Sequence, residues 1–126
     1  MNVHFLAGLS LFLSGFAFSA PLAAGEVDVE AVKVERSGNG AYRFDVTLRH
    51  ADEGWDHYAD RWDVVAPDGA VLGSRVLLHP HDTEQPFTRS LDGVAIPDGI
   101  KSVIIRGHDK VHELGGKEMS VELPQN

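Results

Sequence analysis

The 126-residue sequence contains no cysteine. This absence excludes disulfide bonds, a thiol nucleophile, thiolate metal ligands and a lipid anchor on a cysteine of this sequence. A domain built from it must be held together by core packing alone, which is feasible for the ~100 residues that follow the N-terminal segment.

Positive charge is scarce as well. The chain has 11 Lys and Arg against 19 Asp and Glu, which gives a formal net charge of −8. An excess of negative charge disfavours binding to a phosphate backbone, so we expect no nucleic-acid partner. We interpret the charge as an aid to solubility.

The apolar run near the N-terminus is too short to cross a membrane as a helix. It reads FLAGLSLFLSGFAF over residues 5–18, whereas a spanning helix needs about 20 apolar residues. Small residues follow it at 19–24, and this order is typical of a secretory signal peptide. Because residues 1–4 contain no Lys or Arg, an uncleaved N-terminal anchor is the competing interpretation.

We therefore predict a signal peptide at residues 1–24 and a single mature domain at 25–126. Cleavage is predicted near Ala24, with cleavage at Ser19 as the alternative. The mature protein would be periplasmic or secreted and would have no membrane span.

Helix signals are nearly absent after residue 25, and strand signals separated by turn residues replace them. In the second predicted strand, Tyr42, Phe44, Val46 and Leu48 alternate with polar residues, which indicates one buried and one solvated face. The first strand changes phase at Ala31, which predicts a β-bulge. The predicted strands cover residues 27–34, 42–48, 58–66, 70–78, 87–94, 100–107 and 118–123.

Seven short strands in a chain of this size predict an all-β fold. We expect one antiparallel β-sandwich of the immunoglobulin or fibronectin type III class, with Trp62 of the third strand buried in its core. A small β-barrel is the alternative.

The connections fall into two groups, because strand directions alternate in an antiparallel fold. One end has short turns at 37–40, 67–69 and 97–99, while the other has longer loops at 51–57, 79–86 and 108–117. All six histidines after residue 25 lie in or next to the longer loops, so we expect the functional surface at this end.

Much of the region 54–116 resembles a known family. The segments that carry the resemblance read GWDHYAD at 54–60, HPH at 79–81, EQPFTRSL at 84–91 and HDKVH at 108–112, before Gly115 and Gly116. They are similar to a family of small exported bacterial proteins that is uncharacterised. The resemblance implies a periplasmic location, and it implies no activity, cofactor or catalytic residue.

Two histidine pairs are candidate metal ligands. His79 and His81 flank a proline, and residues two apart in an extended segment point to the same side. His108 and His112 are four apart in a glycine-rich loop. If these four imidazoles hold a metal, Zn²⁺ or Cu²⁺ fits nitrogen and oxygen ligands, and the lack of cysteine disfavours Cu(I). The alternative is that the histidines hydrogen-bond to nearby backbone or are solvated.

Other loop residues could form a surface for a ligand or a partner. Trp55 and His57 could form an aromatic recognition patch with Tyr58, although packing beneath the loop explains Trp55 and Tyr58 equally well. We expect inward-facing Arg89 to form a structural ion pair with Asp60, Asp63 or Asp82. The acidic residues of the candidate surface are Asp82, Glu84, Asp109 and Glu113.

Signals for catalysis are weak. Ser74, Thr88 and Ser90 lie on predicted strands without a nucleophile elbow, and no glycine-rich phosphate loop is present. We predict no catalytic and no cofactor-binding residues. The leading hypothesis is a non-catalytic periplasmic module whose histidine-rich loops bind a protein or a small ligand. A Zn²⁺- or Cu²⁺-binding protein is the alternative hypothesis, and a small hydrolase is the hypothesis with the least support.

Overall fold

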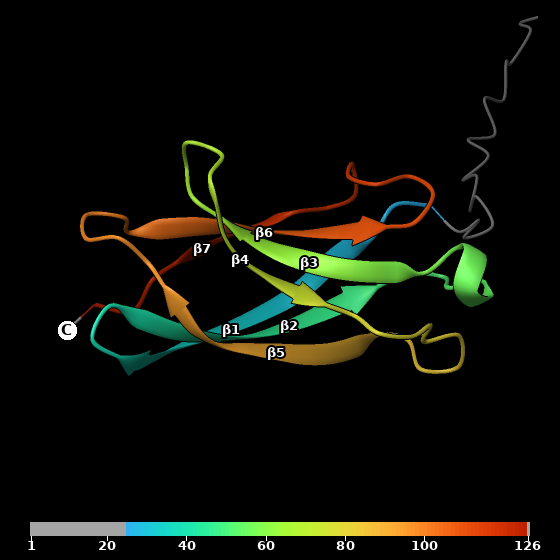
Figure 1. Ribbon diagram of the computed structural model, residues 1–126, viewed down its shortest axis with the longest axis horizontal. Helices are drawn as coiled ribbons and strands as arrows, with labels where there is room; N and C mark the ends of the chain where they lie inside the picture. Colours follow the sequence, from blue (N-terminus) through green and yellow to red (C-terminus); the bar gives the residue numbers. More distant parts are fainter. Residues whose placement is uncertain (1–24, 126) are drawn as a thin grey trace, which may run out of the picture.

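The computed structural model describes residues 25–125, whose seven strands form two antiparallel sheets, one of three strands and one of four (Figure 1). The predicted signal peptide lies outside the described residues. The elements are β1 (Asp28–Gly38), β2 (Ala41–Arg49), the short 3₁₀ helix η1 (Gly54–Asp56), β3 (Ala59–Val65), β4 (Val71–Val76), β5 (Phe87–Ala95), β6 (Ser102–Asp109) and β7 (Met119–Glu122).

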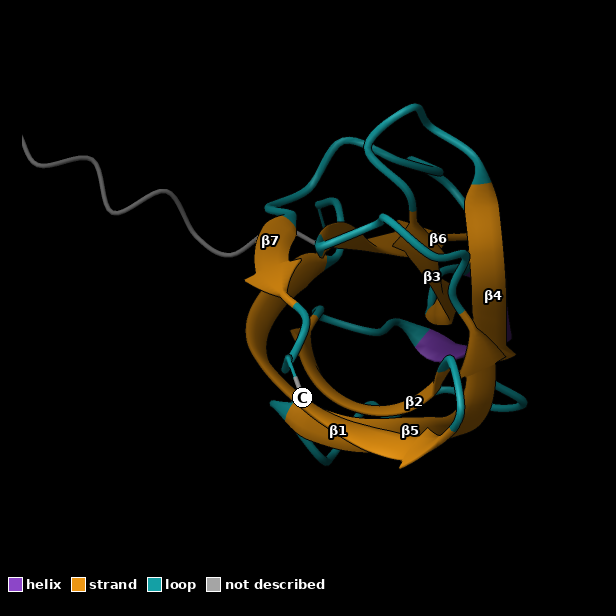
Figure 2. Cartoon of the chain, turned by 90° about the vertical axis from the view of Figure 1, so that its left-hand side faces the viewer, coloured by secondary structure: helices purple, strands orange, loops and turns teal. Residues whose placement is uncertain are grey.

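The strands are ordered β1-β2-β5 in one sheet and β4-β3-β6-β7 in the other. Figure 2 shows the two sheets as layers that face each other, with β4 along one side. In the constant-type immunoglobulin fold the fourth strand joins the sheet of the first, second and fifth. Here it pairs with β3 instead. The predicted fold class, an antiparallel β-sandwich, is confirmed.

The alternation of apolar residues sets the buried face of each sheet. In β2, Tyr42, Phe44, Val46 and Leu48 are all buried, as their spacing predicts. The phase change in β1 is also confirmed, because its register with β2 shifts between Val29 and Ala31.

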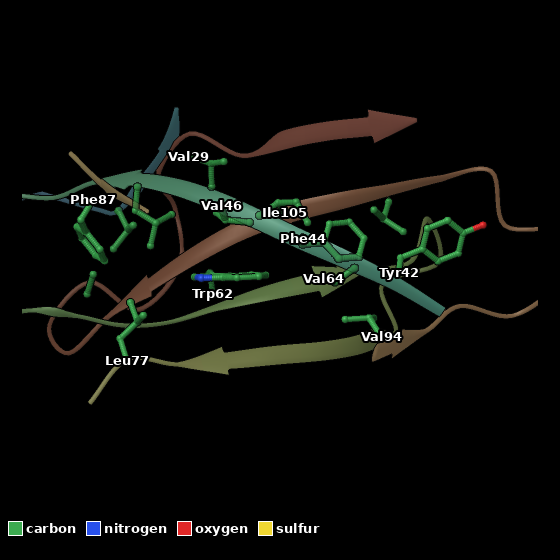
Figure 3. Close-up of a cluster of buried hydrophobic side chains, with 14 of the residues drawn as sticks. Val29, Tyr42, Phe44, Val46, Trp62, Val64, Leu77, Phe87, Val94 and Ile105 are labelled. Carbon is green, nitrogen blue, oxygen red and sulfur yellow. The ribbon is translucent and has the colours of Figure 1, made fainter. Parts of the chain in front are cut away.

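The core lies between the sheets and is centred on large side chains (Figure 3). Trp62 is fully buried, as predicted, and so are Phe44 and Phe87. Burial of these rings contributes strongly to stability, and truncating such a residue to alanine costs about 3–5 kcal/mol. The core therefore provides a rigid support for the loops at each end.

The three longer connections lie at the same end of the sandwich, as predicted, and the chain enters the domain there at residue 25 (Figure 1). The entering segment packs very closely on β6 and the following loop. A Cβ atom at Gly107 would lie 2.3 Å from a methyl of Val27, and one at Gly116 would lie 1.9 Å from the Val27 carbonyl oxygen. Only glycine permits this approach.

Candidate functional site

Two histidines of the connection between β2 and β3 and the aspartate that ends β6 meet beneath the loops. His50 follows β2, His57 follows η1, and Asp109 is the last residue of β6. One potential ligand atom from each lies within 4.8 Å of the others. We call these three residues the histidine–aspartate cluster. It is the one group of three potential metal ligands within residues 25–125.

The two distances from the histidines to the Asp109 carboxylate are close to those between ligands of one metal ion. His50 Nε2 lies 3.6 Å from Asp109 Oδ2, and His57 Nε2 lies 3.3 Å from Asp109 Oδ1. Donor atoms that share an ion at about 2.0–2.2 Å lie about 3.0–3.6 Å apart in tetrahedral or octahedral geometry. Neither pair is hydrogen-bonded, although His50 Nε2 lies 2.9 Å from the Gly25 carbonyl oxygen and Asp109 Oδ1 accepts amide hydrogen bonds from Val111 and His112.

The cluster is buried, and two of its polar atoms have no hydrogen-bond partner. The side chains of His50 and Asp109 are inaccessible to solvent, and that of His57 is 12% exposed. His57 Nε2 and Asp109 Oδ2 are both unpartnered. Buried polar atoms are nearly always bonded, and one left unpaired costs about 1–3 kcal/mol. The described residues therefore leave two buried polar atoms of the cluster without a hydrogen bond.

Asp52 orients the ring of His50 from the side opposite the cluster. Its Oδ1 lies 2.5 Å from His50 Nδ1 and accepts a 3.0 Å hydrogen bond from the Ala59 amide. Its Oδ2 accepts a 2.6 Å hydrogen bond from the His81 amide. A carboxylate on one imidazole nitrogen, with the other nitrogen directed at a metal position, is the usual support for a histidine ligand.

The electrostatics of this pair favour charge on both partners. Burial lowers the pKa of His50, but the hydrogen bond and charge of Asp52, together with the charge of Asp109, outweigh burial and raise it above its ordinary value. Burial raises the pKa of Asp52, yet its hydrogen bonds from His50, His81 and Ala59 lower it overall. The raised pKa favours the protonated form of His50, which offsets part of the charge of the two buried carboxylates.

Asp109 is held in place by the loop that it begins. Its Oδ1 accepts hydrogen bonds from the amides of Val111 at 2.8 Å and His112 at 2.6 Å. Reciprocal backbone bonds between Asp109 and Glu113 close the same loop. His112 lies at its outer side, with Nδ1 3.5 Å from Asp109 Oδ1 and its ring 4.9 Å from that of His57. It is 34% exposed and thus lies between the cluster and solvent.

The four histidines predicted as ligands do not come together as one set. Exposed His79 lies against the ring of His81, which stacks on Phe87. His108 Nδ1 lies 2.5 Å from Asp60 Oδ1. Of the four, His112 alone lies beside the cluster. The loop end therefore contains a compact group of potential metal ligands, and none of the four predicted histidines belongs to it.

The predicted surface residues have mixed positions. Trp55 is 65% exposed and contacts Tyr58 edge to face, while Asp82 caps the amide of Gly54 at 3.2 Å. Asp109 is fully buried and so is not part of the surface. Glu84 lies on the loop exterior, and Glu113 adopts a positive φ of 61° in the loop after β6.

The structure corrects the expected ion-pair partner of Arg89. Arg89 Nη2 lies 2.9 Å from His81 Nε2 and 3.8 Å from Glu84 Oε2, rather than beside Asp60, Asp63 or Asp82. Those three carboxylates are engaged elsewhere: Asp60 with His108, Asp63 with two arginines and Ser74, and Asp82 with the Gly54 amide. Because an arginine only donates, its contact keeps His81 neutral, and burial together with Arg89 lowers the pKa of His81.

The alternation of buried residues along the strands indicates two members of the cluster. His50 continues the buried alternation of Val46 and Leu48 in β2, and Asp109 continues that of Ile105 and Gly107 in β6. A titratable residue in phase with the buried face of a strand needs a partner. Both could have been identified on that basis, whereas the position of His57 depends on the conformation of its loop.

The site and fold define a β-sandwich with a buried histidine–aspartate cluster at its loop end. The chain is 45% identical over 97 residues to a protein of Halomicrobium mukohataei described as "Putative lipoprotein". The match covers 77% of this chain and 47% of the relative, so the chain spans about half the length of that relative. No family model and no solved structure matches the chain. Within the described residues, no helix has the length and apolar character needed to span a membrane.

Proposed function

We propose that this protein is an exported, non-catalytic binding module and that the ligand of its loop end is a divalent transition-metal ion. The observation that carries the proposal is the pair of buried, unpartnered atoms His57 Nε2 and Asp109 Oδ2, which lie beside His50 Nε2. A cation bound between them would satisfy both atoms and neutralise the charge of Asp109.

The donor set selects the class of ion. Two imidazole nitrogens and a carboxylate oxygen suit borderline ions such as Zn²⁺ and Cu²⁺, whereas Ca²⁺ and Mg²⁺ prefer oxygen ligands throughout. Three protein ligands leave at least one coordination position for water or a further donor. His112 at the outer side of the cluster is one group within reach of that position.

The contacts of the hydroxyl side chains support a non-catalytic role. Ser74 donates to Asp63, Ser90 pairs with Asp45, and the hydroxyl of Thr88 pairs with that of Thr47. None of these contacts includes a histidine that could act as a general base.

Two observations support export. The order of apolar and small residues at 5–24 is typical of a signal peptide, and the relative from Halomicrobium mukohataei is described as "Putative lipoprotein". We place the mature protein in the periplasm or an equivalent extracytoplasmic compartment on these grounds.

A partner-binding surface at the same end is the second candidate function. Exposed apolar side chains gather in or beside the three longer loops: Trp55, Leu78, Val111 and Leu114. Exposed aromatic and aliphatic side chains are common in protein interfaces. Such a surface could act alone, or it could recognise a partner only when the cluster beneath it holds metal.

Calorimetric titration of the mature protein with Zn²⁺ and Cu²⁺ at neutral pH tests the metal site. We expect binding of one ion per chain, abolished by His57→Ala and retained by His79→Ala. His79 is a matched control because it is an exposed loop histidine outside the cluster. Absence of binding in the unmodified protein would reject the metal proposal, and equal loss in both variants would reject this ligand set.

A further inference from the structure

Besides the cluster, one main-chain group lies against the same metal position. The carbonyl oxygen of Gly25 is 2.9 Å from His50 Nε2. Because His50 Nδ1 contacts the Asp52 carboxylate, a hydrogen bond from Nε2 to a carbonyl requires a doubly protonated ring. If a metal ion displaces that proton, the Gly25 oxygen and His50 Nε2 become two adjacent donors facing the ion.

We propose that Gly25 becomes the N-terminal residue when the leader is removed, and that its α-amino nitrogen and carbonyl oxygen then chelate the ion of the histidine–aspartate cluster. This inference rests on the metal site proposed above. It adds a ligand that no side-chain pattern reveals, and it makes removal of the leader the step that completes the site.

The spacing of the donors supports the chelate. Two donors at right angles on an ion, each about 2.1 Å from it, lie about 3.0 Å apart, close to the observed separation of Gly25 O and His50 Nε2. The amino nitrogen and carbonyl oxygen of one residue close a five-membered ring with a metal. Since both belong to Gly25, placing the oxygen brings the nitrogen within reach.

The start of the domain is held firmly enough to position this residue. Val27 is buried and packs against Gly107 and Gly116 at distances that exclude any side chain there. The Val29 amide donates to the Lys117 carbonyl oxygen, and the Lys117 amide donates to Asp28, both at 2.8 Å. Gly25 is thus two residues from a fixed point. It lines a cleft of about 370 Å³ together with residues that include His50 and Asp52.

Cleavage changes the chemistry of the Gly25 nitrogen. In the precursor this nitrogen is a peptide amide, which does not bind Zn²⁺ with its proton in place. Hydrolysis by a leader peptidase adds water across the Ala24–Gly25 bond, which leaves a carboxylate on Ala24 and an amino group on Gly25. An α-amino group has a pKa of about 7.7–8.0, so it loses its proton readily to bind a metal near neutral pH.

The first test identifies the N-terminus. The full-length chain is expressed in a secreting host, and the exported form is analysed by intact-mass spectrometry. We expect a mature chain that begins at Gly25. A chain that begins at any other residue, or only uncleaved protein, would overturn the inference without affecting the cluster itself.

The second test compares three forms that share all described residues: one with a free Gly25 amine, one with the same amine acetylated, and one extended by Ala24. The core residues all lie within 25–125. Circular dichroism should be used to check that each form is folded. We expect the free-amine form to bind Zn²⁺ and Cu²⁺ at least about tenfold more tightly, because the chelate adds an intramolecular donor. Its Cu²⁺ paramagnetic resonance spectrum should show three coordinated nitrogens, against two in the other forms.

The outcomes separate this inference from the metal site on which it rests. Equal affinities and equal nitrogen counts in the three forms would reject a role for the Gly25 amine while leaving the cluster intact. If none of the three forms binds either ion, the proposed function itself fails. A lower nitrogen count with the acetylated and extended forms supports the chelate directly.

Discussion

At the end of the sandwich with the short turns (the turn end), backbone groups hydrogen-bond to one another. The end with the longer loops (the loop end) instead buries charged side chains. The turn after β3 is closed by main-chain hydrogen bonds between Ala66, Gly69 and Ala70, and glycines adopt positive φ at Gly69 and Gly99. The loop end instead buries two aspartates, Asp52 and Asp109, together with two histidines.

The difference teaches where stability and function lie in this domain. Glycine turns are sufficient to connect strands, so nothing in the fold requires buried carboxylates at the opposite end. Buried charge is costly unless it is paired, and it stays where it has a role or a complete set of partners. Asp52 has such a set, while Asp109 Oδ2 has no hydrogen-bond partner, which is the basis of the proposed metal site.

Removing Asp52 should have the largest effect on the unloaded protein. Asp52→Ala leaves His50 Nδ1 and the amides of Ala59 and His81 without their acceptor in a buried region. We expect a loss of about 3–5 kcal/mol in the free energy of unfolding, measured by urea denaturation. A loss below about 1 kcal/mol would show that the loop end does not depend on this carboxylate.

Metal binding should stabilise the loop end and leave the turn end as it is. At a free Zn²⁺ concentration of about 100 times Kd, linkage predicts about 2.7 kcal/mol of added stability. We expect a corresponding rise in Tm, which His57→Ala abolishes. Hydrogen exchange should slow near β6 and the 51–57 loop, with no change near the turn at 66–70. Uniform slowing over the whole domain would contradict a localised site.

The pH dependence of stability should reverse sign when metal is added. In the unloaded protein the raised pKa of His50 favours folding fully below the unfolded value of 6.5, and this contribution is lost as pH rises through the folded pKa. His81, whose pKa is lowered, has no effect above 6.5 and opposes His50 only below it. Stability without metal should therefore fall as pH rises from 6.5.

With Zn²⁺ present the same rise in pH should increase stability, because the metal binds only neutral imidazole. Thermal unfolding at several pH values, with Zn²⁺ or with a chelator, measures both slopes. His50→Gln should remove the fall seen without metal. Parallel slopes in the two conditions would argue against His50 as a shared ligand.

The smallest effect is expected at the turn end. Asp68 accepts a 2.9 Å hydrogen bond from the Ala70 amide in the exposed turn after β3, the same kind of contact that Asp52 makes with Ala59. Because water replaces an exposed acceptor, Asp68→Ala should cost only about 0.5–1.5 kcal/mol. Urea denaturation of Asp52→Ala and Asp68→Ala compares the free energy lost at a buried acceptor with that lost at an exposed one.

The sequence predicted the fold more fully than the site. The strands follow from alternation and turn residues, because one face of each sheet is buried along most of its length. The histidine-rich end follows from counting strand directions. The histidine–aspartate cluster did not follow from sequence spacing, since spacing favoured His79 with His81 and His108 with His112.

Two physical features explain that shortfall. His50 was expected at the end of a strand, and Asp109 was expected in the following loop as a surface residue, whereas it is the buried last residue of β6. The close approach that Gly107 and Gly116 permit depends on packing between distant segments, and no local pattern reveals it. Gly116 is thus explained by the path of Val27, and a bare glycine pair is no evidence for a phosphate site.

Crystallographic location of the ion is the most direct test of the central claim. Anomalous diffraction at the zinc absorption edge, from crystals of the mature protein grown with one equivalent of Zn²⁺, shows where the ion binds. We predict a peak within about 2.0–2.2 Å of His50 Nε2, His57 Nε2 and an Asp109 oxygen. A peak confined to His79 and His81, or no peak on the protein, would contradict it.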